Sequence, residues 1–252
     1  MVDAVSSNAH ASTFWRDARH MAAENKLTLA AAIILLLFVV ISILAPWLIP
    51  YDPLAVDTSA ALKSPTLTHL FGTDALGRDI LSRVAIATRL DIGMAIGAVA
   101  LSFIIGTGTG AIAGYFGGWI DAIIGRVMDT IMAFPLFVLA MGIVAALGNS
   151  VENIVLATAI INLPFYSRFA RSEVNVRRDM TFVEAARMGG NRSLRLLTFH
   201  IVPNILPTMM VQGSLNLGWA ILNAAGLSFI GLGVRPPTPE WGIMVSEGAS
   251  YI

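Results

Sequence analysis

The sequence predicts an all-α protein that crosses a membrane several times, and three observations lead to this fold class. Of the 252 residues, 56% are hydrophobic and only 13% are charged, whereas an ordinary soluble domain carries about 25% charged residues. The mean hydropathy is +0.74. The apolar residues also gather into long uncharged stretches, and about 20 such residues suffice for one membrane-spanning helix. A soluble enzyme is therefore not expected.

Five stretches have the length and composition of spanning helices. The first, 27–49, is longer than the apolar part of a secretory signal and offers no cleavage site, so we expect an uncleaved anchor. Glu152 and Arg168 bracket the fourth stretch closely, and Pro135 and Pro164 are expected to kink the third and fourth. The remaining stretches are 92–116, 129–147, 151–169 and 204–233.

The basic residues predict which parts of the chain face the cytoplasm. Eleven of the sixteen Lys and Arg residues fall on the side that holds the N-terminus and the segment between the last two spans. Because cytoplasmic loops are enriched in Lys and Arg, that side is predicted to be cytoplasmic. The predicted parts are a cytoplasmic tail (1–26), an anchor (27–49), an extracytoplasmic loop (50–91), a core of four spans (92–233) that includes a cytoplasmic segment at 171–203, and an extracytoplasmic end (234–252).

Small and polar residues within the spans suggest how the helices contact one another. Glycines recur every four residues along the second span, at Gly106, Gly110 and Gly114 among others, which predicts close helix packing. Arg126 and Asp129 are three residues apart and are expected to form an ion pair. Four carboxamides either join helices or line a polar path, and both interpretations stay open: Asn162, Gln212, Asn216 and Asn223.

The cytoplasmic segment 171–203 is too long and too patterned for a simple connection. A short helix is predicted at 180–188, Gly189 and Gly190 end it, and a second helix with an apolar stripe runs on to Pro203. The segment either presses into a groove of a soluble partner or lies on anionic lipid. The residues alone do not choose between these two roles.

This segment resembles the EAA loop of ABC-importer permeases. The resemblance rests on Glu184-Ala185-Ala186, on Gly190 and on the hydrophobic-proline end at Ile201-Val202-Pro203. It implies that the segment couples the chain to a cytoplasmic ATPase. The residues assigned to this role are Glu184, Ala185, Ala186, Gly189, Gly190, Arg192, Leu194, Leu197, Ile201 and Pro203.

Two further motifs resemble the C-type subunit of dipeptide and oligopeptide (peptide/nickel) importers. One is the stretch 227–234 followed by Glu240-Trp241-Gly242. The other is an outer-loop signature that includes Gly72, Thr73, Asp74, Gly77, Arg78 and Asp79. On this resemblance the signature faces a binding protein, with an amphipathic interfacial helix expected at 80–90; an interface anchor with local ion pairs is the alternative.

The resemblance implies a type I permease fold in the bacterial inner membrane. It also implies four partners: a homologous second permease, two cytoplasmic ATPase subunits and an extracytoplasmic binding protein. Five of the family's six helices are predicted here, and the sixth would follow residue 252. The implied cargo is a dipeptide or short oligopeptide, with glutathione, D-amino-acid dipeptides and nickel complexes as alternatives.

The motifs that the chain lacks point away from enzymes. It has no cysteine, no phosphate-binding loop, no H-E-x-x-H and no G-x-S-x-G. We therefore expect no catalytic or metal-binding residues and no cofactor, with ATP and Mg²⁺ bound by partner subunits. Balanced charges give no reason to expect nucleic acid. An autonomous secondary carrier is the alternative function, although it should place a carboxylate near mid-membrane and none is predicted there.

Overall fold

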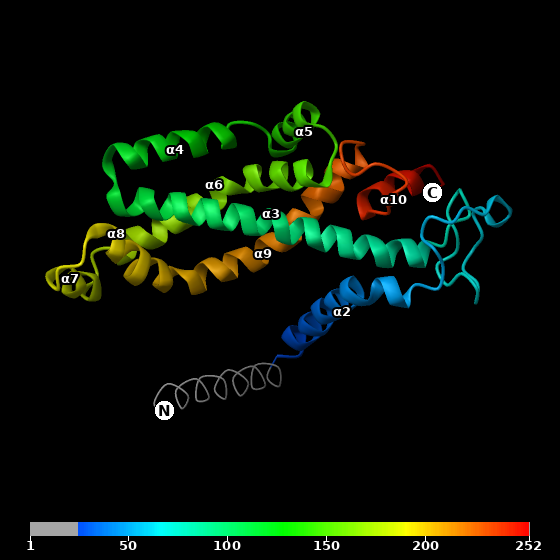
Figure 1. The fold of residues 1–252 in the computed structure, drawn as a ribbon, viewed down its shortest axis with the longest axis horizontal. Coiled ribbons are helices and arrows are strands. Elements are labelled where there is room, and N and C mark those ends of the chain that lie inside the picture. Colours follow the sequence, from blue (N-terminus) through cyan, green and yellow to red (C-terminus); the bar gives the residue numbers. More distant parts are fainter. Residues whose placement is uncertain (1–24, 252) are drawn as a thin grey trace.

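A computed structural model of the chain describes residues 25–251, which form an elongated bundle of helices (Figure 1). The predicted cytoplasmic tail 1–26 lies almost wholly outside the described residues. The long helices are α2 (Lys26–Leu48), α3 (Ile80–Phe116), α4 (Gly118–Met132), α5 (Leu136–Leu147), α6 (Val151–Arg177) and α9 (Val202–Phe229). The short elements are η1 (Thr58–Ala60), α7 (Thr181–Met188), α8 (Ser193–Arg195), the π-helical η2 (Leu196–Ile201), α10 (Trp241–Gly248) and η3 (Ala249–Tyr251).

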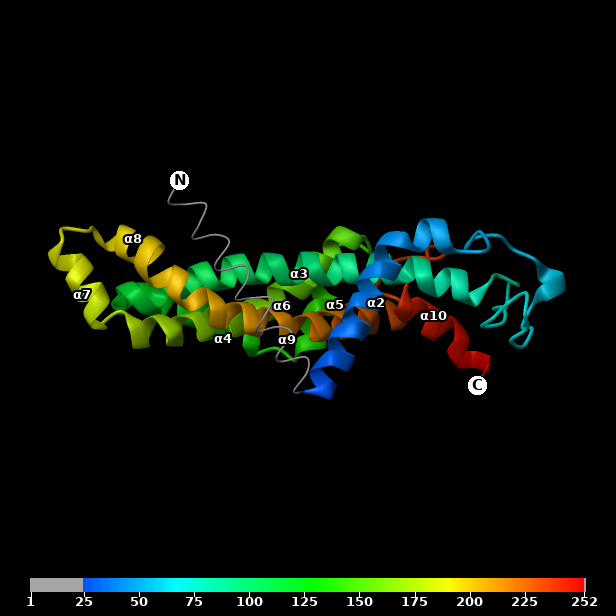
Figure 2. The ribbon, with the colours of Figure 1, turned by 90° about the horizontal axis from the view of Figure 1, so that it is seen from below.

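The helices alternate in direction, so the connections fall at two ends of the bundle (Figures 1 and 2). The segment 50–79 and helix α10 lie at one end, and α7 and α8 lie at the other. We call these the outer end and the inner end, after the predicted orientation. The sequence predicts this alternation. It places the outer-loop signature 72–79 and the EAA-like segment 171–203 at opposite ends of the bundle.

Helices α3 and α6 form the centre of the bundle and run side by side in the same direction (Figure 1). Gly106, Gly110 and Gly114 of α3 face the backbone of α6, and a Cβ on Gly110 would overlap the carbonyl oxygen of Ser167. Since no hydrophobic force drives helices together in lipid, close backbone contact gives such a pair its packing energy. The predicted glycine face is therefore confirmed over these three positions.

Three described helical stretches are long and apolar enough to cross a membrane: Lys26–Leu48, Ile80–Phe116 and Ser193–Phe229. The predicted third span is not one helix, because α4 and α5 are bent by 91° at a break before Leu136. Pro135 at this break has no backbone N–H and clashes with the preceding turn of a helix. The pair makes up a fourth candidate span or a re-entrant loop.

Helix α6, the predicted fourth span, runs on to Arg177 instead of ending at 169. Its 27 residues give it a length of about 40 Å, enough to cross the hydrocarbon region. It is not among the stretches apolar enough to count as a span by composition, since it carries charged side chains at both ends. Packing against α3, and not hydropathy, decides its place in the bundle.

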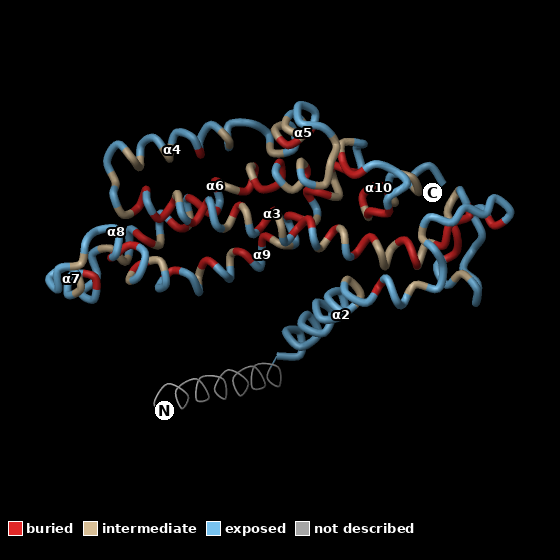
Figure 3. Tube along the Cα trace, in the orientation of Figure 1, coloured by how far each residue is buried: buried red, intermediate tan, exposed pale blue. Residues whose placement is uncertain are grey.

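Burial is concentrated where α3, α6 and α9 meet (Figure 3). One apolar cluster contains Tyr166, Ile205 and Met209, and a second, nearer the outer end, contains Ile154 and Leu227. Helix α2 is apolar on all sides, and Ala45 is its one buried residue. A helix with this composition is suited to lipid or to another membrane protein.

Two local predictions are wrong. Residues 80–90 are not a separate interfacial helix but the first turns of α3, and Ser82, Arg83 and Thr88 on one side of these turns are buried in the protein.

Asp129 pairs with Arg168 of α6 rather than with Arg126. Arg171 pairs in the same way with Asp121, so both ion pairs connect α4 to α6. Pairing between helices replaces the expected pairing within one turn.

Candidate functional sites: a central cavity and the two ends of the bundle

The four carboxamides singled out in the sequence lie around one cavity. Asn162 of α6 and Gln212, Asn216 and Asn223 of α9 line a volume of about 550 Å³. The remaining lining residues are apolar or aromatic: Leu136, Phe137, Phe165 and Trp219. None of the described residues that line this cavity is charged. A mixture of aromatic walls and a few polar groups is typical of sites for small molecules.

The carboxamides of the cavity are not all used to join helices. Asn162 donates to the carbonyl oxygen of Thr158 in its own helix, at 2.8 Å. The Asn216 Nδ2 is buried and has no acceptor within hydrogen-bonding distance among the described residues. The Tyr166 hydroxyl of α6 lies close to the same carboxamide, so Asn216 is placed to join α9 to α6 as well as to line the cavity.

The cytoplasmic segment is anchored at the inner end by part of its apolar stripe. Leu197 and Ile201 of η2 and Val183 of α7 are buried in the apolar cluster that contains Tyr166 and Met209. Thr181 is the first residue of α7, and Met180 precedes it without a side-chain cap. The segment is thus fastened to the bundle core and is not a loose loop.

The tip of this segment is exposed and carries the motif residues. Glu184, Ala185, Gly189, Gly190 and Arg192 are exposed. Gly190 has φ +82°, a conformation that glycine adopts without strain. Leu194 is exposed instead of joining the buried stripe, and Met188 is 90% exposed. Ala186 is half-buried, and Pro203 is exposed at the start of α9.

The outer-loop signature folds onto the beginning of α3. Asp79 caps this helix, where its carboxylate accepts hydrogen bonds from the Ser82 N–H at 2.8 Å and from His69 Nδ1 at 2.9 Å. Gly77 has φ +74°, and a Cβ there would overlap the Asp57 carbonyl oxygen. Thr73 donates to the Ala60 carbonyl, and Gly72 also has a positive φ of 75°.

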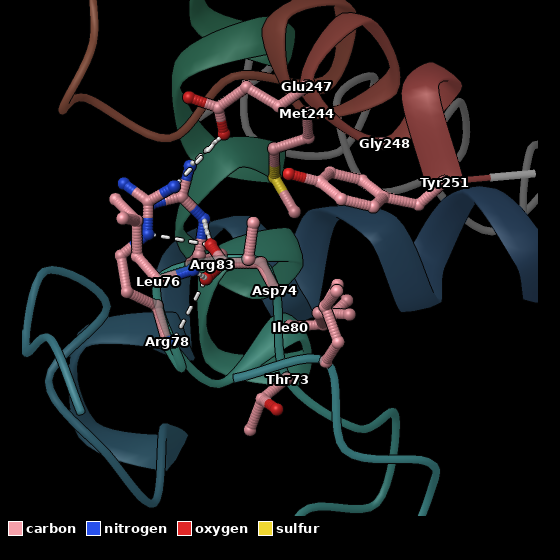
Figure 4. Close-up of a pocket in the computed structure, with 12 residues that line it drawn as sticks. Thr73, Asp74, Leu76, Arg78, Ile80, Arg83, Met244, Glu247, Gly248 and Tyr251 are labelled. Carbon is pink, nitrogen blue, oxygen red and sulfur yellow. Dashed lines mark hydrogen bonds and ion pairs between the residues drawn. The ribbon is translucent and has the colours of Figure 1, made fainter. Parts of the chain in front are cut away.

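Two arginines and two carboxylates form a cluster at the outer end, between the signature and α10 (Figure 4). The Arg78 Nε lies 2.6 Å from Asp74 Oδ2, and the Arg78 and Arg83 Nη2 atoms lie 3.0 and 3.2 Å from Glu247 Oε2. Both arginine side chains are at least 95% buried. A cavity of about 380 Å³ opens beside the cluster.

Two carboxylates outside the spanning helices have a lowered pKa. Burial alone would raise the pKa of Asp79, but hydrogen bonds from Ser82 and His69 outweigh it and lower the pKa below 3.8. The Ser59 hydroxyl and N–H lower the pKa of Asp57. Each hydrogen bond favours the ionised carboxylate, so both residues are held as anions in the folded outer segment.

Sequence reasoning missed three groups of residues at these sites. Glu247 completes the outer cluster by pairing with Arg83, from which 164 positions separate it. Phe137, Phe165 and Trp219 supply the aromatic walls of the central cavity. Met188 and Phe199 are exposed at the inner end. Of these residues, only Met188 carries a signal in the sequence, because it follows the Glu184-Ala185-Ala186 triplet closely.

Comparisons with known proteins agree with these observations. Residues 106–252 match the family described as binding-protein-dependent transport system inner membrane component. Residues 13–65 match the N-terminal TM domain of oligopeptide transport permease C. The two matches lie on either side of the outer signature and together include all the long helices except the first part of α3.

Three curated relatives are similar over most of their length. A probable D,D-dipeptide transport system permease protein of Escherichia coli (strain K12) is 44% identical over 226 residues, which are 90% of this chain and 76% of the relative. A dipeptide transport system permease protein of Alkalihalophilus pseudofirmus is 42% identical over 94% of this chain and 78% of its own. A glutathione transport system permease protein of Pectobacterium atrosepticum is 38% identical over 94% and 79%.

The identities and coverage are high enough to assign a family, and the apolar helices make the chain a multi-pass membrane protein. The predicted permease function is confirmed, and the alternative of an autonomous secondary carrier finds no support. The chain belongs to the family of membrane permease components of binding-protein-dependent ABC importers.

Proposed function

We propose that this permease forms half of the pathway by which an ABC importer takes up dipeptides or short oligopeptides. The observation that carries the proposal is the central cavity, in which Asn162, Gln212, Asn216 and Asn223 meet beside aromatic side chains. Carboxamides can bond to the peptide groups that all such substrates share. A lining without charges would not select among substrate side chains by charge, which suits a chain whose relatives are named for dipeptides and for glutathione.

The energy for transport is proposed to come from two cytoplasmic ATPase subunits. The support is the exposed tip around Glu184 and Gly190, which the buried Leu197 and Ile201 fasten to the bundle core. A rigid element between an exposed contact and a packed core can transmit the closure of a partner to the helices. The chain itself would bind no cofactor, and ATP and Mg²⁺ would belong to the ATPases.

The remaining partners are proposed to be a homologous second permease and an extracytoplasmic binding protein. Helix α2 and one side of α9 expose apolar side chains, among them Leu215 and Leu222, on surfaces that suit lipid or another permease. The outer segment exposes Leu67, which is 98% exposed, and Phe71, where a binding protein would approach. We place the chain in the inner membrane of a bacterium, with its N-terminus in the cytoplasm.

Single-cysteine labelling tests whether the cavity is part of the pathway. The chain has no cysteine, so Gln212→Cys introduces one thiol into the cavity. The importer is purified as the complex that this chain forms, placed in liposomes, and assayed for uptake of a radiolabelled dipeptide. We expect a bulky polar thiol reagent to abolish uptake and the peptide to slow the labelling.

Ser214→Cys is the matched control, because Ser214 lies two residues along α9, is exposed and does not line the cavity. Labelling there should leave uptake unchanged. Complete labelling of Gln212→Cys without loss of uptake would show that the pathway runs elsewhere. Mass spectrometry of the purified complex identifies the ATPases and the second permease independently of this result.

A further inference from the structure

The motif Glu240-Trp241-Gly242 connects the segment after α9 to three helices, through contacts of Trp241 and Gly242. The Trp241 N–H donates to Asp91 Oδ2 of α3 at 3.1 Å. The Trp241 ring packs edge-on against Phe38 of α2, with centroids 5.9 Å apart. A Cβ on Gly242 would overlap the backbone of Ala225 in α9. The start of α10 is therefore held firmly against the bundle.

Two carboxyl groups meet at this junction, away from water. Asp91 is 1% exposed and Glu240 is 0% exposed, and the two side chains are neighbours, because the Trp241 N–H that follows Glu240 donates to Asp91 Oδ2. Asp91 Oδ2 accepts from Trp241 and Glu240 Oε2 accepts from the Ile243 N–H at 2.8 Å. The other two oxygens, Asp91 Oδ1 and Glu240 Oε1, are buried and have no donor in the described part of the chain.

Within residues 25–251, no positive charge balances the pair. Arg235, in the segment that leads to Glu240, is exposed. On α3, Arg89 is exposed and Arg83 is paired with Glu247 of α10. On α6, Glu152 is exposed. Helix α9 carries no charged residue, and α2 carries only Lys26, at its far end. Two adjacent buried carboxylates repel each other, and each loses its hydration, so both cannot stay ionised.

We propose that Asp91 and Glu240 share one proton and that this proton forms the hydrogen bond joining the start of α10 to α3. One carboxyl group then donates through its O–H, the other accepts, and both orphaned oxygens are satisfied. Since the same helix α10 delivers Glu247 to Arg78 and Arg83 at its other end, the proton also holds the outer charge cluster together.

The sign of the pH dependence follows from this arrangement. The bond exists while the pair holds its proton and is lost when rising pH removes it, leaving two buried anions. Residues 240–248 should then separate from α3 and α9, and Glu247 should leave the arginines. Protonation of this carboxyl pair thus controls whether α10 stays attached to the bundle at the outer end of the permease.

Infrared spectroscopy of the purified complex in lipid nanodiscs tests the shared proton directly. We expect a carbonyl band of a protonated, buried carboxyl group at neutral pH that disappears at alkaline pH. Asp91→Asn and Glu240→Gln should each remove it, and Glu152→Gln, which changes an exposed carboxylate, should not. A wild-type spectrum without the band overturns the proposal, as does a band that neither variant changes.

Thermal unfolding of the same complexes separates a proton from a cation and from simple packing. The melting temperature of the wild type should fall as the pH rises, and Glu240→Gln should abolish that fall because its amide N–H donates to Asp91 at every pH. Glu240→Ala should melt lower than Glu240→Gln. A melting temperature that follows the Na⁺ concentration at constant pH would mean that a cation bridges the carboxylates, and would refute the shared proton.

Discussion

The two ends of the bundle use their motif residues in opposite ways. At the outer end the motif residues stabilise the fold itself. Asp74 pairs with Arg78, Arg78 also pairs with Glu247 of α10, and Asp79 caps α3. At the inner end Glu184 and Gly190 are exposed, and the fold is held by other residues such as Leu197. A motif can therefore mark a folded platform or a free contact surface.

The difference between the ends has a physical cause. A charged side chain placed inside the protein must find a partner, because desolvation is costly. The outer cluster meets that need with Asp74, Arg78 and Arg83 from one stretch of the chain and Glu247 from the distant helix α10. An exposed charge such as that of Glu184 stays hydrated and free for a second protein.

The largest effect is expected at the outer cluster. Arg83→Ala would leave Asp74 and Glu247 with one arginine fewer and should cost about 3–5 kcal/mol, the usual loss when one partner of a buried ion pair is removed. Denaturation of the purified complex in mild detergent measures this. Arg187→Ala at the exposed inner tip is the control and should change stability by less than about 0.5 kcal/mol. Equal effects would remove the contrast between the ends.

A pair of glycines sharpens the same comparison. Gly77 and Gly190 have φ +74° and +82°, so alanine is strained at both, by about 1–2 kcal/mol. At Gly77 the new Cβ also overlaps the Asp57 carbonyl, whereas the space around Gly190 is open. Gly77→Ala should therefore destabilise more than Gly190→Ala in the same unfolding assay. The reverse order would show that the outer loop is not packed as described.

Acid should weaken the outer end through Asp79. Because its pKa in the folded protein is lowered, its contribution is complete above the unfolded pKa of about 3.9 and is lost as the pH falls through the lower folded value. Asp79→Ala should cost about 0.5–2 kcal/mol as a lost helix cap at neutral pH. The gap between wild type and variant should narrow in acid, and a constant gap would contradict the assignment.

The smallest effect on stability should come from Glu184→Lys, within about 0.5 kcal/mol because the side chain is exposed. Its effect should be on assembly, with loss of the ATPase subunits from the purified complex and loss of peptide uptake. Glu152→Lys makes the same charge reversal at the outer end of α6 and should retain both. Normal ATPase binding by Glu184→Lys would favour the lipid-lying role of the segment.

The sequence predicted the helical class, the alternating directions, the glycine face of α3 and the positions of the three motifs. These follow from local information, since hydropathy, glycine spacing and short motifs are all read within about 20 residues. The same reasoning failed at 80–90, where charged residues suggested an interfacial helix. The partners of Arg83, Asp74 and Glu247, lie outside this stretch, so the pattern could not show that Arg83 is buried.

By itself, then, the sequence determined what kind of protein this is: a multi-pass membrane permease, with motif-bearing segments that lie at opposite ends of the bundle. Only the tertiary structure decided which side chains meet. It brought four carboxamides to one cavity, replaced the expected Arg126–Asp129 pair by Arg168–Asp129, and placed Asp91 beside Glu240. Such contacts join residues far apart in the chain, and they depend on how whole helices pack, which no local pattern specifies.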